Sequence, residues 1–191
     1  MKEVTFEDIQ RANETIQTTD IKGKNYAEVN QRIKAFRMIY PTGIITTELL
    51  SNENGVCIFR ANVGYMSNGE LYKLATGTAY EKEGSTFINK TSYIENCETS
   101  AVGRALGMAG FGIDTSIASA EEVQNAIVQQ DGMKLVTAAN VNVLQGLIKS
   151  LPEAKAFYEN LLSTYNITDL AQLTAKQYGE ILLEIKKLKG E

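Results

Sequence analysis

Apolar residues near the start of the chain recur at the spacing of an amphipathic helix. Phe6, Ile9 and Ile16 share one side of residues 6–18, and Thr5, a residue type that often caps helices, comes directly before them. A second helical pattern covers residues 26–40, after a break at Lys22-Gly23-Lys24. Pro41 ends it, because proline cannot continue a helix. The sequence therefore predicts two helices before residue 41.

Three segments with strand composition follow, at residues 43–50, 56–66 and 70–80, and they are rich in Ile, Val, Thr and Tyr. The links between them, SNENG and SNG, have the length and the Asn-Gly content of hairpin turns. We therefore predict an antiparallel three-stranded meander.

Alternation along the second strand sorts its side chains between the two faces of the sheet. The candidates for the inner face are Val56, Ile58, Ala61 or Asn62, and Val63, and those for the outer face are Arg60 and Tyr65. We expect the outer face to be solvated or covered by another subunit.

Residues 91–110 have the period of a long helix, which we expect to lie on the sheet. Its central stripe contains Ile94, Cys97, Ala101, Ala105 and Met108. Gly103, Gly107 and Gly110 cost such a helix about 1 kcal/mol each relative to alanine. Close packing against strand backbone would offset that cost.

The remainder of the chain is predicted to be helical. A loop at residues 111–119 precedes a helix from Ser119 to about Gln130, which Asp131-Gly132 is expected to end. From Thr137 onward, Leu, Ala and Lys become frequent and three helices are predicted. The predicted fold class is α+β, with a core at residues 1–130 and a small all-helical module at residues 131–191.

Composition narrows the functional classes. The 191 residues are 43% hydrophobic and 22% charged, as in soluble globular proteins. The absence of histidine excludes Ser-His and Cys-His catalytic pairs and the commonest transition-metal ligand. There is no P-loop, no apolar run near 20 residues and no signal-peptide pattern, so we expect a cytoplasmic protein with Cys57 and Cys97 as buried thiols.

The net charge of −4 means that any nucleic-acid site must be local. Basic residues gather between Lys22 and Arg104, where ten Lys and Arg residues outnumber eight acids. This stretch contains the predicted sheet and its flanking helices.

Residues 91–112, TSYIENCETSAVGRALGMAGFG, and residues 22–41, KGKNYAEVNQRIKAFRMIYP, carry a resemblance to a known family. They are similar to the single-strand DNA annealing proteins of bacteriophages, the essential-recombination-function (ERF) group, and more remotely to the eukaryotic Rad-fifty-two annealases. The resemblance spans about residues 20–120. It implies a homo-oligomeric ring or filament that holds single-stranded DNA in a basic groove. It also implies annealing of complementary strands in phage recombination, in the cytoplasm of an infected bacterium and without ATP, metal or enzymatic chemistry.

The resemblance also implies candidate binding residues. Arg104 matches the hallmark arginine of the family and would contact phosphate, while Arg32 and Tyr40 approximate its basic and aromatic residues ahead of the sheet. Further candidates for nucleic-acid contact are Lys24, Lys34, Arg37, Arg60, Lys73, Lys90 and Tyr93. Gly103 and Gly107 stand where the eukaryotic family has basic residues, so the groove would be less basic and would depend on contacts repeated along an oligomer.

Three alternatives stay open. The protein could coat single-stranded DNA without annealing it, or act as an oligomeric interaction module that binds no nucleic acid. A metal-dependent nuclease built on Glu95, Glu98 and Asp114 is the least favoured. For the C-terminal helices, analogy suggests docking of a host single-strand-binding protein.

Overall fold

The computed structural model describes residues 4–190, and the chain divides into two compact units, Met1–Ala126 and Ile127–Glu191. The division falls within helix α4, Ala120–Met133. This helix was expected to stop before Asp131-Gly132, but it continues through both residues.

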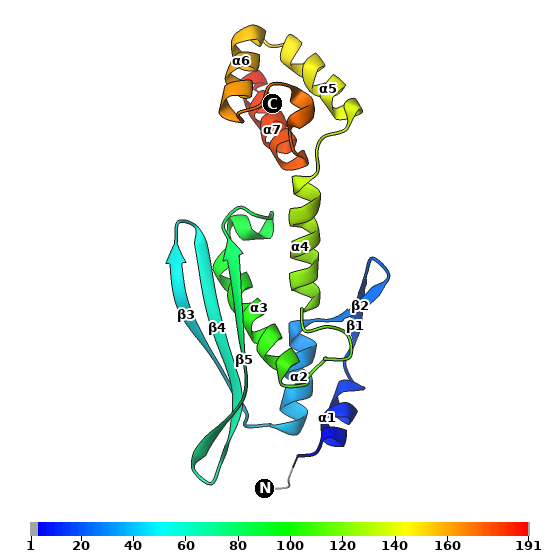
Figure 1. The fold of residues 1–191 in the computed structure, drawn as a ribbon, viewed down its shortest axis with the longest axis vertical. Helices are drawn as coiled ribbons and strands as arrows, with labels where there is room; N and C mark the ends of the chain where they lie inside the picture. Colours follow the sequence, from blue (N-terminus) through cyan, green and yellow to red (C-terminus); the bar gives the residue numbers. More distant parts are fainter. Residues whose placement is uncertain (1–3, 191) are drawn as a thin grey trace. The chain divides into compact units, whose positions relative to one another are not determined.

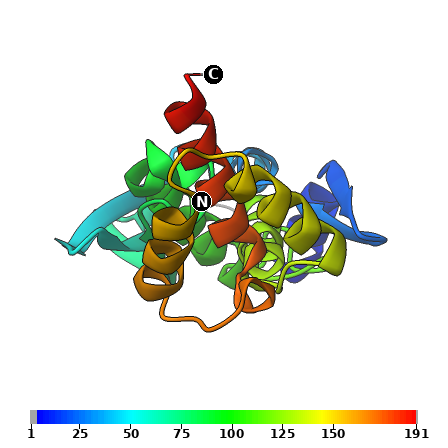
Figure 2. The same cartoon turned by 90° about the horizontal axis from the view of Figure 1, so that it is seen from above.

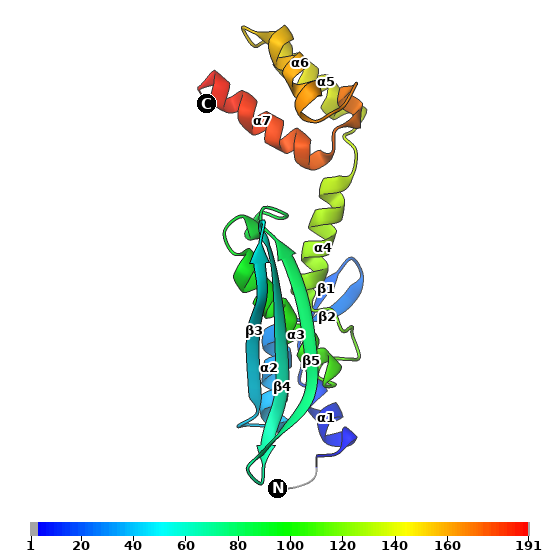
Figure 3. The ribbon, with the colours of Figure 1, turned by 60° about the vertical axis from the view of Figure 1, so that its left-hand side comes forward.

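The centre of the first unit is a three-stranded antiparallel sheet in the order β3-β4-β5. Its strands are β3 (Ile44–Glu53), β4 (Val56–Ser67) and β5 (Glu70–Lys82), each longer than predicted. Asn54-Gly55 and Asn68-Gly69 form the two turns, and all four residues have positive φ, as two-residue hairpin turns that match the twist of a sheet require. The predicted meander is thus confirmed (Figure 3).

Helix α3, Tyr93–Met108, lies against β4 and β5 as the sequence predicted (Figure 1). The approach is closest at Gly77 of β5, where a Cβ would overlap the backbone of Ala101 and Ala105. The glycines of the helix do not serve this contact, contrary to expectation. Gly103 and Gly107 turn away from the sheet, and Gly110 lies beyond the helix end with a φ of +98°.

The side chains of β4 sort differently from the prediction. The buried face consists of Cys57, Phe59, Ala61 and Val63, and Tyr65 continues it toward the core. Val56 and Ile58 belong to the opposite face, where they are only half-buried. Their apolar character suggested the inner face, but the strand period is two, so burial of Phe59 and Ala61 places them outside. Both cysteines are buried free thiols, as expected.

The N-terminal segment contains a hairpin that the sequence patterns missed. Helix α1, Phe6–Asn13, is shorter than predicted and starts with a capping box between Thr5 and Asp8. Strands β1 (Thr18–Ile21) and β2 (Lys24–Ala27) then pair antiparallel around Lys22-Gly23.

Helix α2, Val29–Ile39, begins later than predicted because residues 24–27 belong to the hairpin. It packs on α3, and α1 packs on α2. From α2 to α3 the order of elements is therefore α-β-β-β-α.

The second unit is helical, which confirms the prediction for this region. It contains α5 (Ala138–Lys149), α6 (Ala154–Thr164) and α7 (Ala175–Lys189), with a short 3-10 helix, η2, at Leu170–Gln172 (Figure 2). Its core includes Leu144, Leu161, Leu173, Ile181 and Ile185.

Candidate nucleic-acid interface

Arg32 of α2, expected at a binding surface, is fully buried. Its guanidinium donates hydrogen bonds to four backbone carbonyl oxygens, with donor–acceptor distances of 2.7 Å to Gly103, 2.5 Å to Ser116, 2.7 Å to Ile117 and 3.1 Å to Ala118. Burial lowers the pKa of Arg32, and the carboxylates of Glu122 and Glu121 work against that shift. The structure thus places Arg32 inside the fold and not on a surface: its side chain joins α2 to α3 and to the segment before α4.

The glycines of the residues 91–112 motif make room for this arrangement. A Cβ at Gly107 would lie 2.5 Å from Nη1 of Arg32, and a Cβ at Gly112 would lie 3.2 Å from its Nε. At Gly103 a Cβ would meet Val29 of α2 at 2.7 Å. In this chain, these three glycines of the motif thus let α2 pack closely against α3 and the segment after it.

Arg104, the expected phosphate contact, forms an ion pair in which its Nη1 lies 3.3 Å from Oε1 of Glu122. Its side chain is 35% exposed, and its Nε is buried without a hydrogen-bond partner among the described residues. The other oxygen of Glu122 accepts a hydrogen bond from the backbone N–H of Ser119. Arg104 therefore connects α3 to the start of α4, and about a third of its side chain stays exposed.

Tyr40, another candidate for nucleic-acid contact, lies in the core and not on a surface. Its ring stacks on Tyr65 with centroids 4.9 Å apart, and Tyr65 stacks on Tyr72 at 5.3 Å. Burial raises the pKa of Tyr40.

Five more of the expected cations lie on α2, on β2 and on the sheet, outside the pocket described below. Lys24 starts β2, Lys34 is exposed on α2, and Lys73 is exposed on β5. Arg60 lies on the outer face of β4, 3.8 Å from the exposed carboxylate of Glu48 opposite it on β3. Arg37 donates to the carbonyl of Gly43 while its guanidinium lies over the Phe36 ring, which fixes the side chain at the α2–β3 turn.

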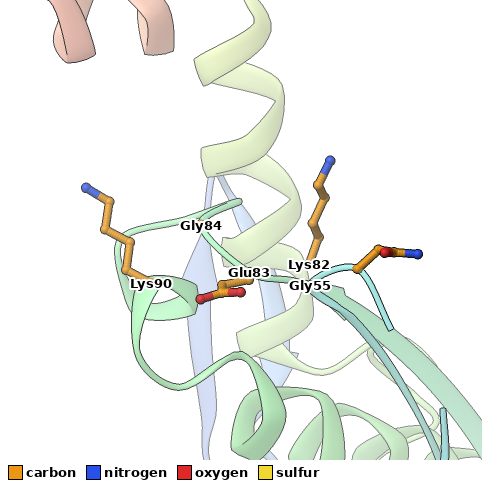
Figure 4. Close-up of a pocket in the computed structure, with 6 residues that line it drawn as sticks. Gly55, Lys82, Glu83, Gly84 and Lys90 are labelled. Atoms are coloured by element: carbon orange, nitrogen blue, oxygen red, sulfur yellow. The ribbon is translucent and has the colours of Figure 1, made fainter. Parts of the chain in front are cut away.

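Lys90 is the predicted cation that lines a pocket. An open pocket of about 380 Å³ lies at the end of the sheet where the β3–β4 turn meets the segment after β5. It is lined by Asn54, Gly55, Lys82, Glu83, Gly84 and Lys90. The ammonium groups of Lys82 and Lys90 extend outward on opposite sides of it, while Glu83 lies between them (Figure 4).

Tyr93 is the first residue of α3, at the same end of the sheet. Its hydroxyl donates to Oδ1 of Asn52 at 3.0 Å, and its side chain is half-buried at the margin of the core. This geometry gives Tyr93 a role in fixing the start of α3 to β3.

A buried polar network fixes the segment between β5 and α3. Asn89 donates to Oε2 of Glu81 (2.6 Å) and to Oγ of Ser85 (2.8 Å), and its Oδ1 accepts from Asn96 (2.9 Å). Its backbone N–H donates to Oγ1 of Thr86 at 3.1 Å. Burial raises the pKa of Glu81, although the hydrogen bond from Asn89 acts in the opposite direction. The segment that presents Lys90 is therefore rigidly attached to the sheet.

Lys82 and the Asn54-Gly55 turn were missed as members of a site, although the sequence contained a signal for them. In an antiparallel meander, the first turn and the last residue of the third strand lie at the same end of the sheet. The predicted turn and the lysines after the predicted third strand could thus have been placed together.

Among residues 4–190, no group of three or more His, Cys, Asp and Glu side chains is arranged to hold a metal ion. The carboxylate of Glu98, one of the nuclease candidates, instead accepts a hydrogen bond from Thr47 at 2.5 Å. Within the same range, no helix combines the length and apolar character needed to cross a membrane.

A family model described as "Slr1353 N-terminal dsRNA-binding domain-like" matches residues 33–109, which is 77 of the 191 residues. The matched part covers most of α2, the whole sheet and α3, which is the α-β-β-β-α unit. This family differs from the annealing proteins that the sequence resembles. A search of curated proteins gives no significant match.

Proposed function

We propose that the protein binds single-stranded nucleic acid through the end of its sheet and promotes the pairing of complementary strands without ATP. The observation that carries the proposal is the likeness of the α-β-β-β-α unit to a nucleic-acid-binding type of domain. The resemblance of residues 91–112 to phage annealing proteins supports the finer function, which is annealing in phage recombination by a homo-oligomer.

Lys82 and Lys90 supply the chemistry at this interface. Lysines that track phosphates hold a strand extended while its bases stay free to pair, and annealing makes or breaks no covalent bond. Two cations per subunit bind one strand weakly, but repetition around an oligomer lets the contacts add. The proposed interface does not include Arg32 and Tyr40, which are buried, or Arg104, which forms an ion pair with Glu122.

The description of the matched family as dsRNA-binding domain-like favours a second candidate, which is binding of double-stranded RNA. Such domains recognise the shape of an A-form duplex over about 16 bp, through phosphates and 2′-hydroxyls. A protein of this kind would prefer the duplex to either separated strand and would not accelerate pairing.

Binding to a labelled single strand and to a duplex RNA of equal length, each over a salt series, separates these functions. We expect salt-sensitive binding to the single strand and faster pairing with its complement. The double variant Lys82→Gln/Lys90→Gln should lower the slope of log K against log salt by about 0.7 for each lost phosphate contact. The control Lys149→Gln/Lys187→Gln, at exposed lysines of the second unit, should bind as wild type does.

Each other outcome points to a different function for this protein. Preference for the duplex would favour the RNA-binding candidate, and single-strand binding without faster pairing would indicate a coating protein. No binding to either ligand at low salt would refute a nucleic-acid function and favour the interaction module.

A further inference from the structure

Phe87 is the most exposed of the large apolar side chains in the described residues, with 84% of its surface accessible. It immediately precedes the 3-10 helix η1, Ile88–Lys90, and Ile88 is 57% exposed. Single exposed apolar residues are ordinary on protein surfaces. Phe87 differs from such a residue because its backbone is hydrogen-bonded in place and a lysine lies next to its ring.

The backbone that carries Phe87 is fixed. Asn89, two residues later, is fully buried and bonded through its side chain to Glu81, Ser85 and Asn96. Its carbonyl oxygen accepts from the N–H of Gly84 at 2.9 Å. The ring is therefore held on an ordered turn, so little conformational entropy of the loop is lost when a ligand stacks on it.

Positive charge lies beside this ring. Nζ of Lys90 is over the Phe87 ring, 6.0 Å from its centroid, and Lys90 also lines the pocket at the end of the sheet. Lys82 lies on the other side of that pocket (Figure 4). Glu83 between them keeps an anion out of the centre, so phosphates are expected to follow the lysines at the rim.

We propose that Phe87 is a stacking platform for an unpaired base of the bound strand, with Lys90 and Lys82 holding the adjacent phosphates. This inference rests on the proposed function and specifies its ligand as a single strand. An apolar planar surface beside cations is complementary to a base with its phosphate, and stacking tolerates any base sequence. Stacking occupies the face of a base and leaves its pairing edge open, as annealing requires. In an intact duplex the base faces are already stacked on their neighbours.

The chain contains no tryptophan, so Phe87→Trp introduces a single fluorescent reporter at the proposed platform. Phe6→Trp on α1 is the matched control, because Phe6 is also well exposed, at 64%, but belongs to a different surface. Adding a single-stranded oligonucleotide to the full-length variants should quench the tryptophan emission of the Phe87→Trp protein through stacking and leave that of the Phe6→Trp protein unchanged. A duplex of the same sequence should quench neither variant.

Phe87→Ser provides the second measurement. Loss of the stacking contact with one base should weaken the affinity for a single strand by between about 5-fold and 150-fold. The slope of log K against log salt should stay unchanged, because no phosphate contact is lost. Thermal unfolding should match wild type, since the side chain is outside both cores.

The outcomes separate this inference from the proposed function. If wild type binds the single strand but Phe87→Trp is not quenched and Phe87→Ser binds equally well, the platform is refuted while the proposed function stands. If no variant and no wild-type protein binds, both fail. Emission of Phe87→Trp that shifts to the blue with protein concentration, without nucleic acid, would overturn the proposal in favour of a contact between copies of the chain.

Discussion

Replacing Arg32 by methionine should destabilise the protein by about 3–5 kcal/mol. Methionine fills much of the same volume but leaves four carbonyl oxygens, of Gly103 and residues 116–118, without their donor. A hydrogen bond to a charged group contributes about 1.5–3 kcal/mol, but these four bonds act as a unit and do not add fully. Three of the acceptors also lie in a loop that can turn toward water once the guanidinium is gone, which limits the loss.

Urea denaturation followed by circular dichroism measures this effect. Arg37→Met is the matched control, because Arg37 lies on the same helix with an exposed side chain and donates to one carbonyl. It should cost about 1 kcal/mol. An Arg32→Met protein within about 1 kcal/mol of wild type would refute the structural role assigned to Arg32. Normal stability combined with weak single-strand binding would return Arg32 to the binding residues.

Further predictions concern the glycines, one carboxyl group and one thiol. Gly107→Ala should lower the free energy of unfolding by about 1–3 kcal/mol, because the new Cβ would displace Arg32. In the same denaturation assay, Gly146→Ala should raise it by about 0.5–1 kcal/mol, because the new Cβ would meet no neighbour. Burial raises the pKa of Glu81 above its ordinary 4.5, so the folded state binds this proton more tightly and loses stability as pH rises above that value. Glu81→Gln should therefore flatten this pH dependence in thermal unfolding, and an unchanged profile would contradict the assignment. Burial also raises the pKa of Cys97 to about 12, so a thiol-alkylating reagent at mildly alkaline pH should label it only after unfolding, as mass spectrometry would show.

The hairpins illustrate how far sequence patterns reach. Asn54-Gly55 and Asn68-Gly69 were predictable as turns because asparagine and glycine adopt positive φ at low cost. Lys22-Gly23 has nearly the same geometry, with φ of 52° and 81°. It was missed because lysine seldom adopts this conformation and the flanking strands are four residues long with mostly polar side chains.

The candidate site was less predictable than the sheet. A sequence shows that Arg32 and Arg104 are charged but does not show what they face. The carbonyl partners of Arg32 lie 71 to 86 residues later, and a backbone carbonyl carries no residue-type signal. The sequence likewise gives no signal that the ring of Phe87 is exposed, and only the structure shows it.

The large sequence separation between Arg32 and its carbonyl partners also affects how the chain folds during synthesis. A nascent chain that ends before residue 103 can already contain α2 and all three strands of the sheet, but its arginine then has none of its carbonyl acceptors. Domains generally fold as units while the ribosome is still translating. The hydrogen bonds of Arg32 can be completed only after Ala118 has left the ribosome, so the guanidinium stays hydrated until that late stage of synthesis.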